Sequence, residues 1–81
     1  MLLRFFASAR AATGLNETRI DLGPDWSIGD ALGTLVAAPG EPLDRVLARC
    51  SFLVNTLSTT DTSTVLSDGD VVDVMPPFAG G

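Results

Sequence analysis

The chain has 81 residues, 46% of them hydrophobic and 19% charged, so it has room for one small folded domain and is too apolar to stay disordered. Ten acids against five bases give a formal charge of −5, which disfavours nucleic acid and anionic membranes as partners. All five bases are Arg, and the absence of Lys and His excludes Ser-His-Asp triads, Schiff-base lysines and imidazole metal ligands. We therefore expect no catalytic machinery, bound metal or bound cofactor in this chain.

The cysteine content and the hydropathy bear on where the protein works. The single cysteine, Cys50, cannot close an internal disulfide, which predicts a reducing compartment and makes the cytoplasm the expected location. A lone cysteine beside Phe52 and Leu53 is more often a small buried hydrophobe than a sulfur relay, so we place Cys50 in the core. No apolar run approaches the roughly 18 residues of a membrane span.

The first part of the chain predicts two strands joined by a long connection. Residues 1–7 have the apolar pattern of a strand that is buried on both faces. Residues 8–14 form an Ala-rich connector of about one helical turn, which Gly14 ends. Residues 16–22 alternate apolar and charged side chains as a half-exposed strand does, so we expect the two strands to form a hairpin.

The middle of the chain predicts the main helix. Ser27 followed three residues later by Asp30 gives a capping-box-like start. The helical apolar stripe, which stops before Pro39, contains Ile28, Ala31, Leu32, Leu35 and Val36. Pro42 then opens a second, short helix, on which Arg45 and Arg49 are solvated.

The last part of the chain predicts a short strand, a polar segment and a final strand. Residues 51–55 form the short strand, and seven of the nine residues from 56 to 64 are Ser or Thr, which favours an exposed loop or an edge strand. Residues 67–70 read as a tight turn in which Gly69 is able to take a positive φ. The apolar run 71–75 is the final strand, which ends at Pro76-Pro77 because neither proline has an N–H to donate.

This order of elements predicts an α+β fold of the ubiquitin-like β-grasp type. The first and last strands are the most apolar, so we expect them to be central neighbours, made parallel by a right-handed crossover. A mixed sheet of four to five strands would then carry the main helix on one face. Residues 1–75 form the predicted domain, and residues 76–81 project from it as a tail.

The tail is the feature that most needs a functional explanation. Six residues from Pro76 to Gly81, at about 3.3 Å each, can reach roughly 20 Å from the domain. Glycine lacks a Cβ, so Gly80-Gly81 can thread a narrow channel and present an unhindered terminal carboxylate for attack on a nucleotide phosphate. The chain has no phosphate-binding loop, so an ATP-using partner must supply the activation. The pattern favours a substrate or carrier over a stand-alone catalyst.

Four stretches of the sequence resemble the small, sulfur-carrying subunit of molybdopterin synthase: FFASARAATG, LVN, LSDGDVVDVMPP and the final GG. In that family, the terminal glycine is adenylated by a ubiquitin-activating-like enzyme and converted to a thiocarboxylate with sulfur from a donor protein. The large subunit, in an expected heterotetramer, uses this sulfur to convert cyclic pyranopterin monophosphate to molybdopterin. The resemblance implies that ATP is used by the activating enzyme and that this chain binds no cofactor.

The resemblance also assigns roles to individual residues. Gly81 is the implied thiocarboxylate bearer, and the arm inserted into the large subunit is Pro76, Pro77, Phe78, Ala79 and Gly80. Beyond the resemblance, Met75, Leu57 and Phe6 are candidate apolar contacts with the partner, with core packing the alternative for Phe6 and Leu57. Arg10 is a candidate contact with an acidic partner group, with a solvated side chain as the alternative.

Three other interpretations stay open. Carriers of the thiamin pathway and other sulfur donors also end in Gly-Gly, so the acceptor of the sulfur can differ. A ubiquitin-like modifier needs the same adenylation but ends in an isopeptide bond to a lysine of another protein. A noncovalent interaction domain is the third interpretation, and it leaves the tail unexplained.

Overall fold

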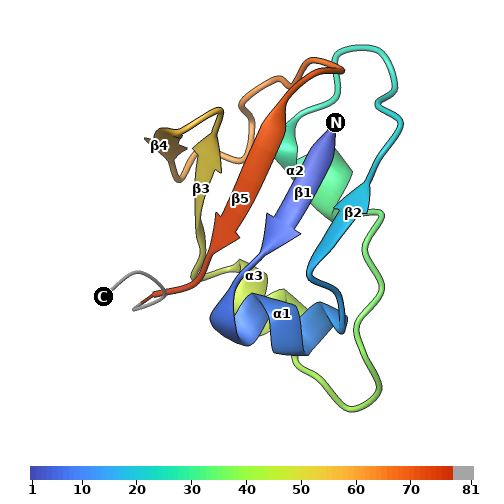
Figure 1. The fold of residues 1–81 in the computed structure, drawn as a ribbon, viewed down its shortest axis with the longest axis vertical. Helices are drawn as coiled ribbons and strands as arrows, with labels where there is room; N and C mark the ends of the chain where they lie inside the picture. The colour runs from blue at the N-terminus through green and yellow to red at the C-terminus, as the bar shows by residue number, and fades with distance from the viewer. Residues whose placement is uncertain (78–81) are drawn as a thin grey trace.

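The computed structural model describes residues 1–77, which form a five-stranded sheet and three short helices (Figure 1). The strands are Leu2–Phe5 (β1), Glu17–Arg19 (β2), Ser51–Val54 (β3), Leu57–Thr59 (β4) and Val71–Met75 (β5). The helices are Ala7–Thr13 (α1), Ile28–Leu32 (α2) and Leu43–Leu47 (α3). None of these helices is long and apolar enough to cross a membrane.

The sheet is mixed, with the strand order β2-β1-β5-β3-β4. The first and last strands, β1 and β5, are parallel neighbours, in a register that pairs Leu3 with Val72 and Phe5 with Val74. All other pairs are antiparallel. The two most apolar strands thus lie in the middle of the sheet, where both of their edges are paired, and the predicted β-grasp arrangement is confirmed.

The core lies between one face of the sheet and α2, which packs behind it in Figure 1. Phe5 and Phe52 are each 1% exposed, and they supply the largest buried side chains. Cys50 is buried among them, as the sequence predicts, and its thiol donates to the Val46 carbonyl oxygen at 3.2 Å. Burial raises the pKa of the Cys50 thiol, because desolvation penalises the thiolate.

Helix α2 begins where the sequence predicts but ends early. The capping box is present: the Ser27 hydroxyl accepts from the Asp30 N–H at 3.2 Å, and the Asp30 carboxylate accepts from the Ser27 N–H at 2.9 Å. The predicted stripe continues to Val36, yet the helix stops after Leu32, and Val36 is 82% exposed. Gly33 is a poor helix former, and the Thr34 hydroxyl donates to the Ala31 carbonyl at 2.7 Å, so the last turn has local alternatives to the helix.

Helix α1 is longer than the single turn expected of the Ala-rich connector. It spans seven residues, and Ala9 and Ala12 are fully buried. Their small side chains let α1 pack closely against β1 and α3 at one end of the sheet (Figure 1). Gly14 ends the helix as predicted: its φ of 72° is left-handed, and its N–H donates to the Arg10 carbonyl at 2.8 Å.

The Ser- and Thr-rich segment contains an edge strand, β4, which a two-residue turn joins to β3. Asn55 and Thr56 both have positive φ, 48° and 76°, as a type I′ hairpin turn requires. Further along, Ser63 donates twice to the Asp61 carboxylate, at 2.9 and 2.6 Å, which lowers the pKa of Asp61. The sequence misses this hairpin turn because neither of its central residues is glycine.

The turn before β5 is where the sequence places it. The Asp70 N–H donates to the Ser67 carbonyl at 3.0 Å, and the Asp70 carboxylate accepts from the Ser67 N–H at 2.8 Å. Gly69 does not use its freedom to take a positive φ, since within residues 1–77 the glycines with positive φ are Gly14 and Gly40. The carboxylate of Asp70 closes the turn, so no left-handed residue is needed.

Candidate functional site at the base of the tail

The tail leaves the domain from the end of a strand that is held on both sides. β5 pairs with β1 and β3, and its last residue, Met75, lies opposite Ser51. Pro76 is buried and Pro77 is exposed, so the chain reaches the surface between these two residues. Phe78, Ala79, Gly80 and Gly81, on which the predicted arm and reactive carboxylate fall, lie outside the described residues. The described part of the site is therefore its base.

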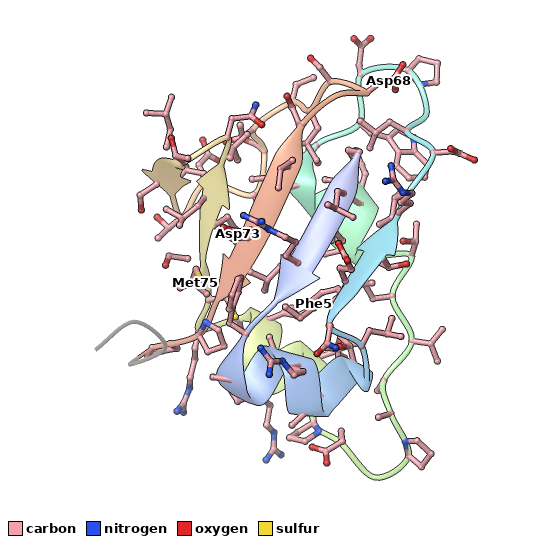
Figure 2. The ribbon with its side chains drawn as sticks, in the orientation of Figure 1. Phe5, Asp68, Asp73 and Met75 are labelled. Atoms are coloured by element: carbon pink, nitrogen blue, oxygen red, sulfur yellow. The ribbon has the colours of Figure 1, made fainter. Side chains whose placement is uncertain are left out.

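The sheet face opposite α2, here named the open face, has apolar residues on β1, β3 and β5, charges at its centre and the charged Glu17 and Arg19 on β2. Side chains alternate along each strand, so those next to the core residues of β1, β3 and β5 point to the open face. Its half-buried apolar members are Leu2, Leu53, Val71 and Met75. Figure 2 shows Met75 at the tail end of β5, with Asp73 further up the same strand and Asp68 in the turn at the opposite end.

An ion pair joins the two central strands in the middle of the open face. Arg4 and Asp73 are direct partners in the β1–β5 register, and the guanidinium meets the carboxylate at two points, 2.6 Å from Nε to Oδ1 and 3.0 Å from Nη2 to Oδ2. The hydrogen bonds and charge of Asp73 raise the pKa of Arg4, and the nearby Glu17 adds to the effect. This is the only ion pair among residues 1–77. It pairs the two charges that β1 and β5 place at the centre of this face, beside the exposed Glu17 and Arg19 of β2.

The predicted contact residues divide between two places. Phe6 and Met75 each follow the last residues paired between β1 and β5, Phe5 and Val74, so they lie at the same end of the sheet. Leu57 pairs with Val54 at the far end of β3, on the same side of the sheet as the core, and is 75% exposed. The structure therefore brings Phe6 and Met75 together but leaves Leu57 apart from them.

The charged candidate, Arg10, lies on α1 and is exposed. It has no ion-pair partner among residues 1–77. Its predicted contact with an acidic partner group stays a prediction.

A groove beside the base of the tail was not predicted. It has a volume of about 370 Å³, and we name it the Arg45–Arg49 groove; its lining is Ser8, Pro42, Arg45, Val46, Arg49 and Pro77. Three segments distant in the sequence meet here: the start of α1, helix α3 with its following turn, and the residue at which the tail begins. From the sequence, Arg45 and Arg49 are solvated positions of a short helix. Their spacing of four residues, which puts both side chains on one side of a helix, was the only local indication of this groove.

The described residues offer little chemistry of their own. Residues 1–77 contain no group of three or more Cys, Asp or Glu side chains arranged to hold a metal ion. Cys50 is buried, and the raised pKa of its thiol keeps it protonated near neutral pH, so it is not a nucleophile.

Comparison with known proteins shows the family to which the chain belongs. Residues 3–81 match the model of the ThiS family. The chain belongs to the ThiS family. Among curated ThiS-like relatives, the molybdopterin synthase sulfur carrier subunit of Chlamydomonas reinhardtii is 35% identical over 78 residues, which are 95% of this chain and 93% of that protein.

Solved structures agree on the fold of this ThiS-family chain. The crystal structure of SAMP1 from Haloferax volcanii superposes with a TM-score of 0.76 at 27% identity, covering 100% of this chain and 98% of that one. A second crystal structure, of the H. volcanii small archaeal modifier protein 1, gives 0.75 at 26% identity and covers 95% of each chain. These likenesses confirm the ubiquitin-like α+β fold.

Proposed function

We propose that this chain is a sulfur carrier, the small subunit of a molybdopterin synthase. The observation that carries the proposal is a ThiS-family domain whose central strand β5 leads through Pro76-Pro77 into Gly80-Gly81. The 35% identity to a molybdopterin synthase sulfur carrier subunit over 95% of the chain supports this branch of the family. The cytoplasm is the proposed location.

The proposed chemistry takes place at Gly81 in other proteins' active sites. An adenylating enzyme binds ATP, and a Gly81 carboxylate oxygen attacks the α-phosphorus, so that pyrophosphate leaves. The outer sulfur of a donor-protein persulfide then attacks the acyl carbon, and AMP leaves with that oxygen. A thiol attacks the donor sulfur of the resulting acyl disulfide, so that the S–S bond breaks, the donor leaves in a new disulfide and the thiocarboxylate remains. In the large subunit the thiocarboxylate sulfur bonds to cyclic pyranopterin monophosphate on the way to molybdopterin, and water hydrolyses the acyl–sulfur bond, which returns Gly81 to a carboxylate.

The described structure supports the proposal at the base of the tail. β5 fixes the origin of the tail, because its hydrogen bonds to β1 and β3 hold it along its length. The buried Pro76 and exposed Pro77 have no N–H to pair, so neither extends the sheet. We propose that Phe6 and Met75, at the same end of the sheet, contact the large subunit while the tail enters it.

The test is intact-mass analysis of the protein recovered from cells that contain the activation machinery. The proposal expects one oxygen to be replaced by one sulfur, and it expects deletion of Gly81, or one residue added after it, to abolish that change while the fold persists. The thiocarboxylated form mixed with large subunit and cyclic pyranopterin monophosphate should yield molybdopterin, with two carriers consumed per product. Consumption by a thiazole-forming system instead would move the chain to the thiamin branch.

A second candidate function is a ubiquitin-like protein modifier. The specific observation in its favour is the likeness to the small archaeal modifier protein SAMP1, with a TM-score of 0.76 over the whole chain. A modifier would appear in cells as heavier conjugates that resist thiol reductants. Because the chain has no Lys, such conjugates cannot grow through lysine side chains of this protein.

A further inference from the structure

We propose that the Arg45–Arg49 groove binds acidic side chains of the adenylating enzyme when that enzyme takes up the tail. This inference rests on the proposed function, since it presumes a partner into which the tail is drawn. It adds to that function a second contact, made by α3 and separate from the open face of the sheet.

The position of the groove is the first argument. Pro77, the last described residue, lines it together with Pro42 and Val46. A protein that encloses the tail must approach the surface around Pro77, and the groove belongs to that surface. When the tail is extended, the four residues after Pro77 span about 13 Å. The groove therefore lies far from the reacting carboxylate, and a docking role fits it better than nucleotide binding.

The charge of the groove is the second argument. Arg45 and Arg49 are exposed, and neither has an ion-pair partner among residues 1–77. The described lining contains no acid, but Arg45 and Pro42 also line a neighbouring depression to which Glu41 and Asp44 belong. A guanidinium presents several N–H donors in a fixed fork that matches a carboxylate, and Val46 and the two prolines add apolar contacts beside it.

The rest of the molecule explains why such a groove is useful. The chain carries a formal charge of −5, so its overall field repels an acidic partner. Asp68 and Asp70 lie in the turn at the opposite end of β5 from the tail (Figure 2). An acidic surface around a tail channel would attract the end of the domain that carries Arg45 and Arg49 and repel the end that carries Asp68 and Asp70. The domain would therefore approach with its tail pointing toward the channel.

The experiment measures ATP–pyrophosphate exchange by the adenylating enzyme of the same organism as a function of carrier concentration. The double variant Arg45→Glu/Arg49→Glu should raise the KM for the carrier about tenfold and leave kcat unchanged, because Gly81 still reacts normally once bound. Arg19→Glu, an exposed charge reversal on β2, is the matched control and should stay near the wild-type KM. The neutral variant Arg45→Gln/Arg49→Gln should fall between the two.

Salt provides a second readout on the unmodified protein. Raising salt from about 50 to about 300 mM should increase the wild-type KM more steeply than that of the Arg45→Glu/Arg49→Glu variant. The proposed role of the groove would be overturned if the double variant and Arg19→Glu had equal KM values and unchanged melting temperatures. In that case exchange by the wild type would still uphold the adenylation step. Absence of exchange by the wild type would overturn the proposed function and this inference with it.

Discussion

Two side chains that could interact with other molecules, Cys50 and Arg4, are already held by contacts within the domain. Cys50 packs in the core, 7% exposed, and its S–H is used in a hydrogen bond to Val46. Arg4 is used in the two-point contact with Asp73. The first group is buried in the core and the second is an exposed side chain held in an ion pair, so neither competes with the tail in the proposed function.

The first prediction concerns the Cys50 thiol. A thiol reagent at pH 8 should label native protein much more slowly than protein unfolded in urea, because burial raises the pKa of Cys50 in the fold. In the unfolded chain this pKa is near its ordinary value of 9.0. The free energy of unfolding is therefore unaffected by this group below about pH 9 and falls as the pH rises through the folded-state pKa. Urea melts of the Cys50→Ala variant should lack that part of the alkaline loss.

The second prediction concerns Met75 on the open face. Met75→Asp should weaken binding to the large subunit at least about tenfold, equivalent to about 1.4 kcal/mol, because it puts an unpaired charge into an apolar contact. Leu57→Asp is the matched control, since Leu57 lies at the far end of β3 and is already 75% exposed. Titration calorimetry compares the two variants. If Leu57→Asp binds more weakly than Met75→Asp, the docking surface includes β4. The separation of Leu57 from the contact residues Phe6 and Met75 would then be wrong.

At the scale of elements, the β3–β4 hairpin departs most from its sequence. A type I′ turn strongly prefers Asn-Gly, and this chain has Asn55-Thr56. The φ of 76° at Thr56 is unfavourable for a β-branched residue, because its side chain crowds the backbone in the left-handed region.

The third prediction follows from this turn. Thr56→Gly should stabilise the domain by roughly 1 kcal/mol, since it relieves the left-handed strain that a side chain brings. Thr60→Gly, outside the turn in the same polar segment, should not stabilise it. Denaturant melts with equal m-values would measure both, and a Thr56→Gly variant no more stable than the parent would show that the loss of backbone entropy offsets the relief.

The predictions from sequence succeeded where the signal was local or strongly periodic. The alternating apolar pattern of residues 71–75 located β5, and Ser27 with Asp30 located the start of α2. The end of α2 was missed because Leu35 packs against the core without being helical, so the stripe outlasts the helix. The Arg45–Arg49 groove was missed because no single stretch of sequence contains it: residue 8, residues 42–49 and residue 77 meet only in the fold.

At the scale of the whole molecule, the strand order predicts how stability is distributed. β1 and β5 are paired on both edges, whereas β4 and β2 are the edge strands. Leu3, Val72 and Val74 in the central pair are fully buried, and β4 is mostly exposed. Local opening should therefore begin at β4 and involve the centre last.

The fourth prediction is a pattern of amide hydrogen exchange. Amides in the β1–β5 ladder should exchange only through global unfolding, with protection that follows denaturant stability. Amides of β4 and of residues 60–65 should exchange faster and independently of mild denaturant, through local opening. NMR exchange at several urea concentrations resolves the two classes, and equal protection at Ser58 and Val72 would contradict the inferred order of opening.

The pairing of β5 on both edges also has a mechanical consequence. A partner that draws the tail into its channel pulls β5 along its own axis, away from α2 and the turn that precedes the strand. The hydrogen bonds to β1 and β3 run across that direction. A force along β5 therefore loads all of them at once in shear and does not break them one after another. Traction on the tail is thereby passed to the whole sheet, and the domain is pulled against its partner as a rigid body before any strand gives way.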